Sequence, residues 1–140
     1  MTEVKVTAAL IQLALGRPEL ALAELDQIIE RVRQAGIRNQ MAELLLAQAQ
    51  ALASLGRLEQ AVKELREAER VAAEIGQRRV LWRIQAMVAE LETRRGNKAA
   101  AETVRRRARE IVAYIAEHAG DDKLRESFIA LPEVQSLLVK

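Results

Sequence analysis

Glycines divide this chain at regular intervals, and this regularity constrains the fold more than any other feature. Five of the six glycines follow one another at intervals of 20 residues, and Gly120 comes after an interval of 24. Glycine readily adopts the left-handed conformation that ends a helix, which costs other residues about 1 kcal/mol. Regularly placed glycines therefore predict regularly placed helix ends. The five are Gly16, Gly36, Gly56, Gly76 and Gly96.

Between the glycines, the apolar residues follow helical spacing. After Gly56 they advance by three or four positions, from Leu58 to Ile75, whereas a strand would alternate apolar and polar residues. Pro18 and Pro132 fit the first turn of a helix. The pattern predicts helices at about 3–15, 18–35, 38–55, 58–75, 78–95 and 98–119, and then two short helices at about 122–130 and 132–139.

The sequence also matches itself at an offset of 40 residues, which is the length of one antiparallel helix hairpin. A single hairpin buries too little surface, so stacked neighbours must supply the core. We therefore expect an all-α solenoid in a single domain, 1–140, with hairpins at about 2–37, 38–77 and 78–119 and closing helices at about 122–139. In this arrangement Gly56 ends the first helix of its hairpin, and Ala61 is small because the second helix crosses close to the first.

At the repeated positions the sequence resembles the tetratricopeptide repeat (TPR) family. That family places a small residue in the first helix of each hairpin (helix A), a glycine at the turn, and an alanine in the second helix (helix B). The matching positions hold Ala9, Ala49 and Ala89, then Gly16, Gly56 and Gly96, then Ala21, Ala61 and Ala101. The resemblance implies a right-handed TPR-like α-solenoid. Arg33, Ala73 and Ala113 replace the proline that usually closes helix B, which accounts for a repeat longer than about 34 residues.

The long repeats are also similar to those in the C-terminal sensor arms of bacterial STAND ATPases, the signal-transduction ATPases with numerous domains, including MalT-like and LuxR-like regulators. The ending "LRESFIALPEVQSLLVK" resembles the short helical tail of such arms. This second resemblance implies that the chain is a terminal fragment of a larger switch protein.

The residue types present argue against catalysis. There is no cysteine, and His118 is the only histidine, so neither a thiolate metal site nor a nucleophile–base pair can be assembled. No glycine-rich phosphate loop is found. We expect no catalytic residues, no cofactor, no metal and no enzymatic activity.

The chain also lacks the signals that would send it to a membrane. Its start has no basic region followed by a long apolar one, and no stretch approaches the roughly 18 apolar residues that a membrane span needs. We therefore expect a cytoplasmic protein with no membrane partner.

Basic residues are concentrated in one segment. Residues 76–110 carry a net charge of +6, whereas residues 1–75 and 111–140 each carry −2. The run Arg105, Arg106, Arg107 and Arg109 is the densest part, but consecutive helical residues point about 100° apart and cannot form one flat patch. A solvated helix face is the leading interpretation, a site for an acidic protein partner comes second, and nucleic acid comes last because no aromatic side chains are interleaved.

The TPR resemblance implies a ligand groove lined by helix A. Val6, Leu10 and Leu13 are also groove positions, but packing on a preceding hairpin is slightly favoured over ligand binding, and association with another molecule is a further alternative. Val4, Ala8 and Ile11, on another face of the same helix, align with positions expected in the core, so this helix is apolar nearly all round. The other candidate groove residues are Glu43, Leu46, Gln50, Arg83, Glu90 and Arg94.

The leading function hypothesis is a non-catalytic protein-interaction or sensor module of a larger signal-transduction protein, which binds a protein or peptide in the concave helix-A groove. The first alternative is a homo-oligomeric scaffold formed through Val6, Leu10 and Leu13. The second is a nucleic-acid-binding helical domain that uses the basic third repeat.

Overall fold

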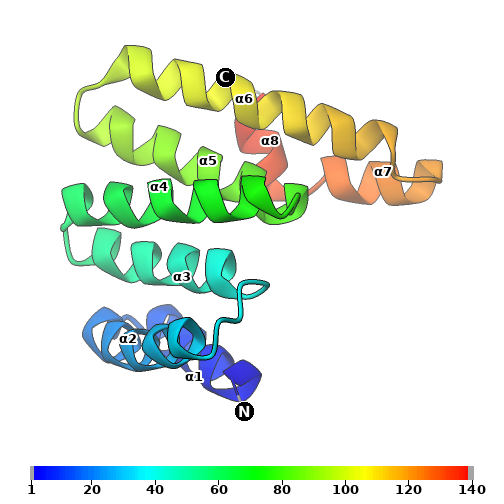
Figure 1. Cartoon of the computed structure of the whole chain (residues 1–140). Helices are drawn as coiled ribbons and strands as arrows, with labels where there is room; N and C mark the ends of the chain where they lie inside the picture. The colour runs from blue at the N-terminus through cyan, green and yellow to red at the C-terminus, as the bar shows by residue number, and fades with distance from the viewer. Residues whose placement is uncertain (1, 139–140) are drawn as a thin grey trace. The chain divides into compact units, whose positions relative to one another are not determined.

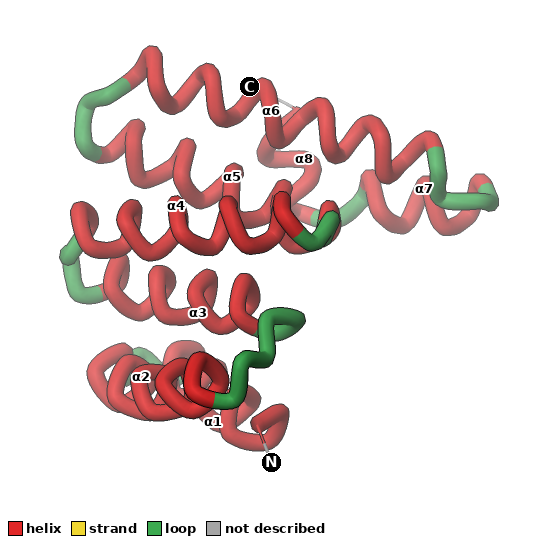
Figure 2. Tube along the Cα trace, in the orientation of Figure 1, coloured by secondary structure: helices red, strands yellow, loops and turns green. Residues whose placement is uncertain are grey.

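The computed structural model describes the backbone of residues 2–138 and the side chains of residues 8–138, and all regular structure in this range is α-helical (Figure 1). Short loops join the helices (Figure 2). The helices are α1 (Thr2–Ala14), α2 (Pro18–Gln34), α3 (Met41–Ser54), α4 (Leu58–Glu74), α5 (Arg78–Arg94), α6 (Lys98–Glu117), α7 (Asp122–Ile129) and α8 (Pro132–Leu138).

The helices fall into two compact units, Met1–Ile75 with α1 to α4 and Gly76–Lys140 with α5 to α8. In the first unit α1 pairs with α2, α3 pairs with α4, and α2 packs against α3. In the second unit α5 pairs with α6, and α7 and α8 both contact α6. The single domain expected from the sequence remains a prediction.

The turn at Gly56 has the backbone conformation expected from the sequence. Gly56 has φ of 77°, its N–H donates to the carbonyl of Ala53 at 3.0 Å, and the N–H of Arg57 donates to the carbonyl of Leu52 at 2.9 Å. This pair of bonds is the Schellman arrangement that ends a helix. A Cβ added at Gly56 would meet no atom within 4 Å, so the backbone conformation, and not lack of space, requires glycine here.

One helix boundary differs clearly from the prediction, because α3 begins at Met41 and not near residue 38. The segment after Gly36 forms an extra turn, in which the N–H of Met41 donates to the carbonyl of Arg38 at 3.2 Å. The repeat carries Arg79 at the position equivalent to Asn39. Arginine is a good helix former, whereas asparagine favours caps and turns, and this difference explains the later start.

The core of the first unit contains small residues where helices cross. Ala61 is 0% exposed, as its place in the repeat predicted. Polar contacts add to the apolar packing. The buried Gln48 of α3 donates from its side-chain amide to Asp26 of α2, and Arg33 binds both carboxylate oxygens of Glu67 at 3.0 and 3.1 Å. These bonds connect α2 with both helices of the next hairpin.

The core of the second unit joins the long helices to the short ones. Trp82 of α5 packs with Ala108 and Val112 of α6, and with Val134 and Leu137 of α8. Phe128 of α7 meets the Trp82 ring edge-on, with the ring centroids 6.0 Å apart. The tail therefore covers an apolar surface of the α5–α6 hairpin. Among residues 2–138, none of the helices combines the length and apolar content that crossing a membrane requires.

Candidate protein-interaction surfaces

The exposed side of α5 carries a charged stripe in the second unit. Arg79, Arg83, Glu90 and Arg94 are all exposed, and their spacing places them along one face of the helix. Arg94 donates to Glu90 at 3.0 Å, which neutralises one end of the stripe. Arg79 and Arg83 make no hydrogen bond or ion pair within the described residues, so their two positive charges face solvent. We call these four residues the α5 stripe.

The predicted groove residues of α3 have mixed environments in the first unit. Glu43 is exposed, Gln50 is half-buried, and Leu46 is only 6% exposed. Leu46 therefore offers little contact area to a partner, and its side chain packs mainly within the protein. Among these three α3 residues only Glu43 is charged, whereas the α5 stripe has two arginines without an ion-pair partner within the described residues.

The first helix exposes apolar residues, including one that the sequence singled out. Leu10 is 43% exposed and Leu13 is half-buried, while the side chain of Val6 lies outside the described residues. Ile11 is 52% exposed, although its repeat equivalent, Ala51, is 0% exposed. Leu15, at the end of α1, is also exposed. The 40-residue alignment contained this signal, because Ile11 aligns with the buried Ala51.

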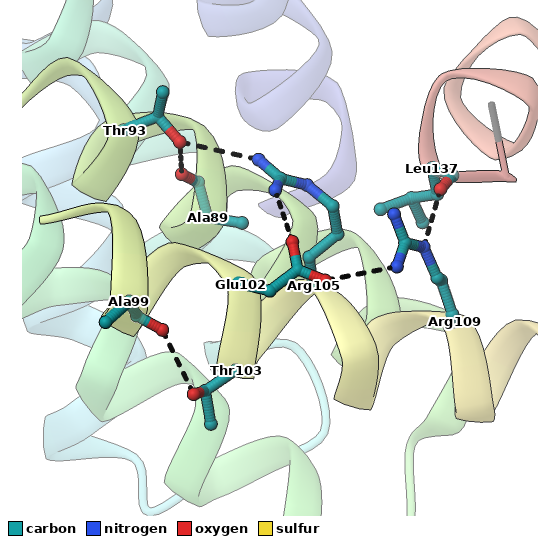
Figure 3. Close-up of polar contacts among 8 residues, drawn as sticks. All are labelled: Ala89, Thr93, Ala99, Glu102, Thr103, Arg105, Arg109 and Leu137. Carbon is teal, nitrogen blue, oxygen red and sulfur yellow. Dashed lines mark hydrogen bonds and ion pairs between the residues drawn. The ribbon is translucent and has the colours of Figure 1, made fainter. Parts of the chain in front are cut away.

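The basic run of α6 separates into two kinds of residue. Arg106 and Arg107 are exposed, whereas Arg105 and Arg109 are half-buried and both bind Glu102, at 3.1 and 3.4 Å (Figure 3). Arg109 also donates from Nε to the carbonyl oxygen of Leu137 at 2.8 Å. Only Arg106 and Arg107 therefore lie on a solvated helix face as expected from the sequence. Arg105 and Arg109 instead bind Glu102, and Arg109 also binds α8.

The repeat explains why these charges lie on α6. Offset by two repeats, Glu102, Arg105 and Arg109 occupy the positions that α2 fills with apolar side chains. Leu25 and Ile29 of α2 are buried, and Asp26 on the same side of the helix bonds to α3. The apolar residues of α2 are therefore replaced in α6 by an ion-paired cluster. The replaced apolar residues are Leu22, Leu25 and Ile29.

Aromatic and cationic groups gather near the end of α6, but they do not form a reactive site. Arg78 lies over the Tyr114 ring at 4.3 Å from its centroid, and the His118 ring stacks on Tyr114 at 4.0 Å. His118 Nδ1 lies 2.8 Å from the Tyr114 carbonyl oxygen, which can only accept, so Nδ1 donates. His118 is exposed at the end of α6. The described residues contain no cluster of three or more His, Cys, Asp or Glu side chains that could hold a metal ion.

Among the described residues, Glu64 has a clearly shifted pKa. Burial raises the pKa of Glu64 above its ordinary value of 4.5, and the nearby carboxylates of Glu67 and Asp26 raise this pKa further. Arg33 and Lys63 act in the opposite direction without cancelling the shift of the Glu64 pKa. One oxygen of Glu64 is buried without a hydrogen-bond partner within the described residues, which agrees with the cost of ionising this group.

Comparison with known proteins supports the fold. Neither a protein-family model nor a curated protein matches the sequence. The structure is similar to the TPR domain of Arabidopsis FLU, with a TM-score of 0.70, 15% sequence identity, and coverage of 86% of this chain and 96% of that chain. The chain therefore has a TPR-like helical-repeat fold, which confirms the all-α solenoid predicted from the glycines and the internal repeat.

Proposed function

We propose that this chain is a non-catalytic protein-interaction module that binds a partner protein or peptide on the α5 stripe. The observation that carries the proposal is the pair of exposed arginines, Arg79 and Arg83, which have no partner within the described residues. Both lie in the segment 76–110, whose net charge is +6. A helical repeat of TPR type offers a rigid surface for such a contact.

The charges of the stripe favour an acidic partner. Arginine binds a carboxylate through two parallel hydrogen bonds, and such pairs are stronger than neutral hydrogen bonds. Two arginines one turn apart can bind two carboxylates on one face of a partner segment. The Glu90–Arg94 pair next to them adds polar contacts with little net charge. An acidic segment therefore fits this surface better than a basic one.

The cellular role proposed for the module rests on sequence resemblance. We place it in the sensor arm of a larger cytoplasmic signal-transduction ATPase of the STAND type, because its repeats and its ending are similar to those of such arms. In such a protein, the partner that conveys the signal would bind to the α5 stripe.

Binding of defined peptides tests the proposal. Two fluorescent peptides of equal length and apolar content, one glutamate-rich and one lysine-rich, are titrated with the chain at low salt. We expect the acidic peptide to bind about tenfold more tightly, which corresponds to about 1.4 kcal/mol. The variant Arg79→Glu/Arg83→Glu should abolish this preference. Arg57→Glu/Arg70→Glu is the matched control, because it makes the same charge change at exposed positions of the first unit.

Two results would contradict the proposal. One is equal affinity for both peptides. The other is an equal loss of binding in the two double variants, because it would show that net charge alone attracts the peptide and that the α5 stripe is not a specific site.

A further inference from the structure

The tail of the second unit, α7 and α8, is held in place by few buried side chains. No residue of α7 is buried, and in α8 only Val134 and Leu137 are. These two lie three positions apart, so they share one face of the helix. A helix as short as α8 is not stable in water without such contacts. Segments with few buried apolar contacts open at low free energy, so α8 can detach while the long helices stay folded.

The surface that α8 covers is apolar and contains the only tryptophan of the chain. Trp82 of α5 is 3% exposed, and Ala108 and Val112 of α6 are buried with it. We call these three residues the Trp82 surface. Both buried side chains of α8 pack on it, and Phe128 of α7 meets the Trp82 ring edge-on. The Trp82 surface therefore accepts a helix that carries two apolar residues three positions apart.

Arg109 lies beside this contact and has an unused donor. Its Nε donates to the carbonyl oxygen of Leu137 in the last turn of α8, and its Nη1 binds Glu102 (Figure 3). The third nitrogen, Nη2, is buried and has no hydrogen-bond partner within the described residues. A buried donor without an acceptor is costly, and a carboxylate is the acceptor that a guanidinium binds most strongly. A helix that ended in an acidic residue would supply this acceptor.

We propose that α8 is a displaceable cover, and that an amphipathic helix of a partner protein takes its place on the Trp82 surface. The partner helix has two apolar residues spaced like those of α8 and an acidic residue at its C-terminal end, where it bonds to Arg109. The acidic residue matters because α8 is tethered, which gives it an effective concentration on the order of millimolar. This inference goes beyond the proposed function, since it uses an apolar surface and leaves the α5 stripe unoccupied.

Detaching α8 in the full chain tests its role as a cover. Val134→Asp/Leu137→Asp should shift the emission of Trp82 to longer wavelength, because water then reaches the ring, while circular dichroism retains most of the helical signal. Leu131→Asp/Leu138→Asp is the matched control, since both leucines are exposed. An equal shift in the two variants, or no shift in either, would overturn the proposal. Unfolding of the whole chain would also overturn it, because α8 would then be indispensable to the fold.

Displacement is tested in the parent chain with two peptides of residues 122–138, one extended by two glutamates and the other by two glutamines. The chain is isotope-labelled, so that its own α8 is distinguished from the peptide. We expect the glutamate peptide to accelerate amide hydrogen exchange in α8 and to bind about tenfold more tightly than the glutamine peptide. Arg109→Gln should remove this difference. Arg106→Gln, which changes an exposed arginine of the same helix, should preserve it.

Two results of the peptide experiment would contradict displacement. One is unchanged exchange in α8 at saturating peptide. The other is protection of Arg78–Arg94 without faster exchange in α8, because the peptide would then occupy the α5 stripe. Arg79→Glu/Arg83→Glu should leave the displacement of α8 intact, so this inference and the proposed function can fail independently of each other.

Discussion

Arg109 of α6 donates a hydrogen bond from Nε to the carbonyl oxygen of Leu137 in α8 at 2.8 Å, and this bond holds α8 against α6. The same guanidinium binds Glu102 at 3.4 Å. Arg109 thus links the ion-paired cluster of α6 to the tail, whose apolar residues Val134 and Leu137 pack near Trp82.

Removing this link should loosen α8. Arg109→Ala should reduce the free energy of unfolding by about 1–2 kcal/mol, because a charge-assisted hydrogen bond and part of an ion pair are lost. Amide hydrogen exchange should accelerate most in residues 132–138. Arg106→Ala is the control, since Arg106 is exposed and unbonded within the described residues. Equal exchange in the two variants would show that apolar packing alone holds the tail.

Replacing Gly56 by asparagine should cost less stability than replacing it by alanine. Gly56→Ala should destabilise the chain by about 1 kcal/mol, because alanine must adopt the left-handed conformation that Gly56 holds at φ of 77°. Gly56→Asn should cost less, since asparagine enters this region more readily. Urea denaturation measures both values. Identical stability of the parent and the alanine variant would remove the conformational explanation of the turn.

Overpacking should distinguish the buried and exposed faces of α4. Ala61→Leu should destabilise by about 1–3 kcal/mol, because Ala61 is fully buried and a larger side chain forces its neighbours apart. Ala73→Leu, on the exposed side of the same helix, should change stability by less than about 0.5 kcal/mol. If the two variants melted at the same temperature, the close crossing at Ala61 would be refuted.

Glu64 should make stability depend on pH in a defined direction. Because folding raises its pKa, the folded chain holds this proton more tightly than the unfolded chain, and the resulting stability is lost as pH rises above the ordinary value of 4.5. Glu64→Gln should therefore be more stable than the parent near pH 7, and the difference should shrink as the pH falls towards about 4. Thermal melts measure the effect, with Glu110→Gln on an exposed face as the control. A constant difference across this pH range would exclude ionisation of Glu64 as its cause.

Much of the fold could be predicted because its signals are local. A glycine ends a helix through its own backbone conformation, so Gly56 could be interpreted without knowledge of its neighbours. Ala61 could be placed in the core because the repeat supplied its equivalents. The start of α3 at Met41 could not be predicted from the repeat, because Asn39 replaces the arginine found at the equivalent position of α5.

The surface features were harder to predict because they depend on contacts between distant residues. The sequence placed Arg105 and Arg109 in one basic run, but it did not show that both bind Glu102 or that Arg109 reaches Leu137. It also singled out Leu10, whereas Ile11 is the more exposed residue. For the two arginines, side-chain geometry determines what a partner can contact, and composition and spacing do not contain it. For Ile11, the signal was present in the 40-residue alignment, where Ile11 aligns with the buried Ala51.

Hydrogen exchange with a bound acidic peptide tests the proposed protein-binding surface most directly. The glutamate-rich peptide is added at saturating concentration to the parent chain, and exchange is compared with and without it. We predict slower exchange concentrated in Arg78–Arg94, and loss of this protection in Arg79→Glu/Arg83→Glu. Protection concentrated in Lys98–Glu117, with α5 unchanged, would contradict the assignment of partner binding to the α5 stripe.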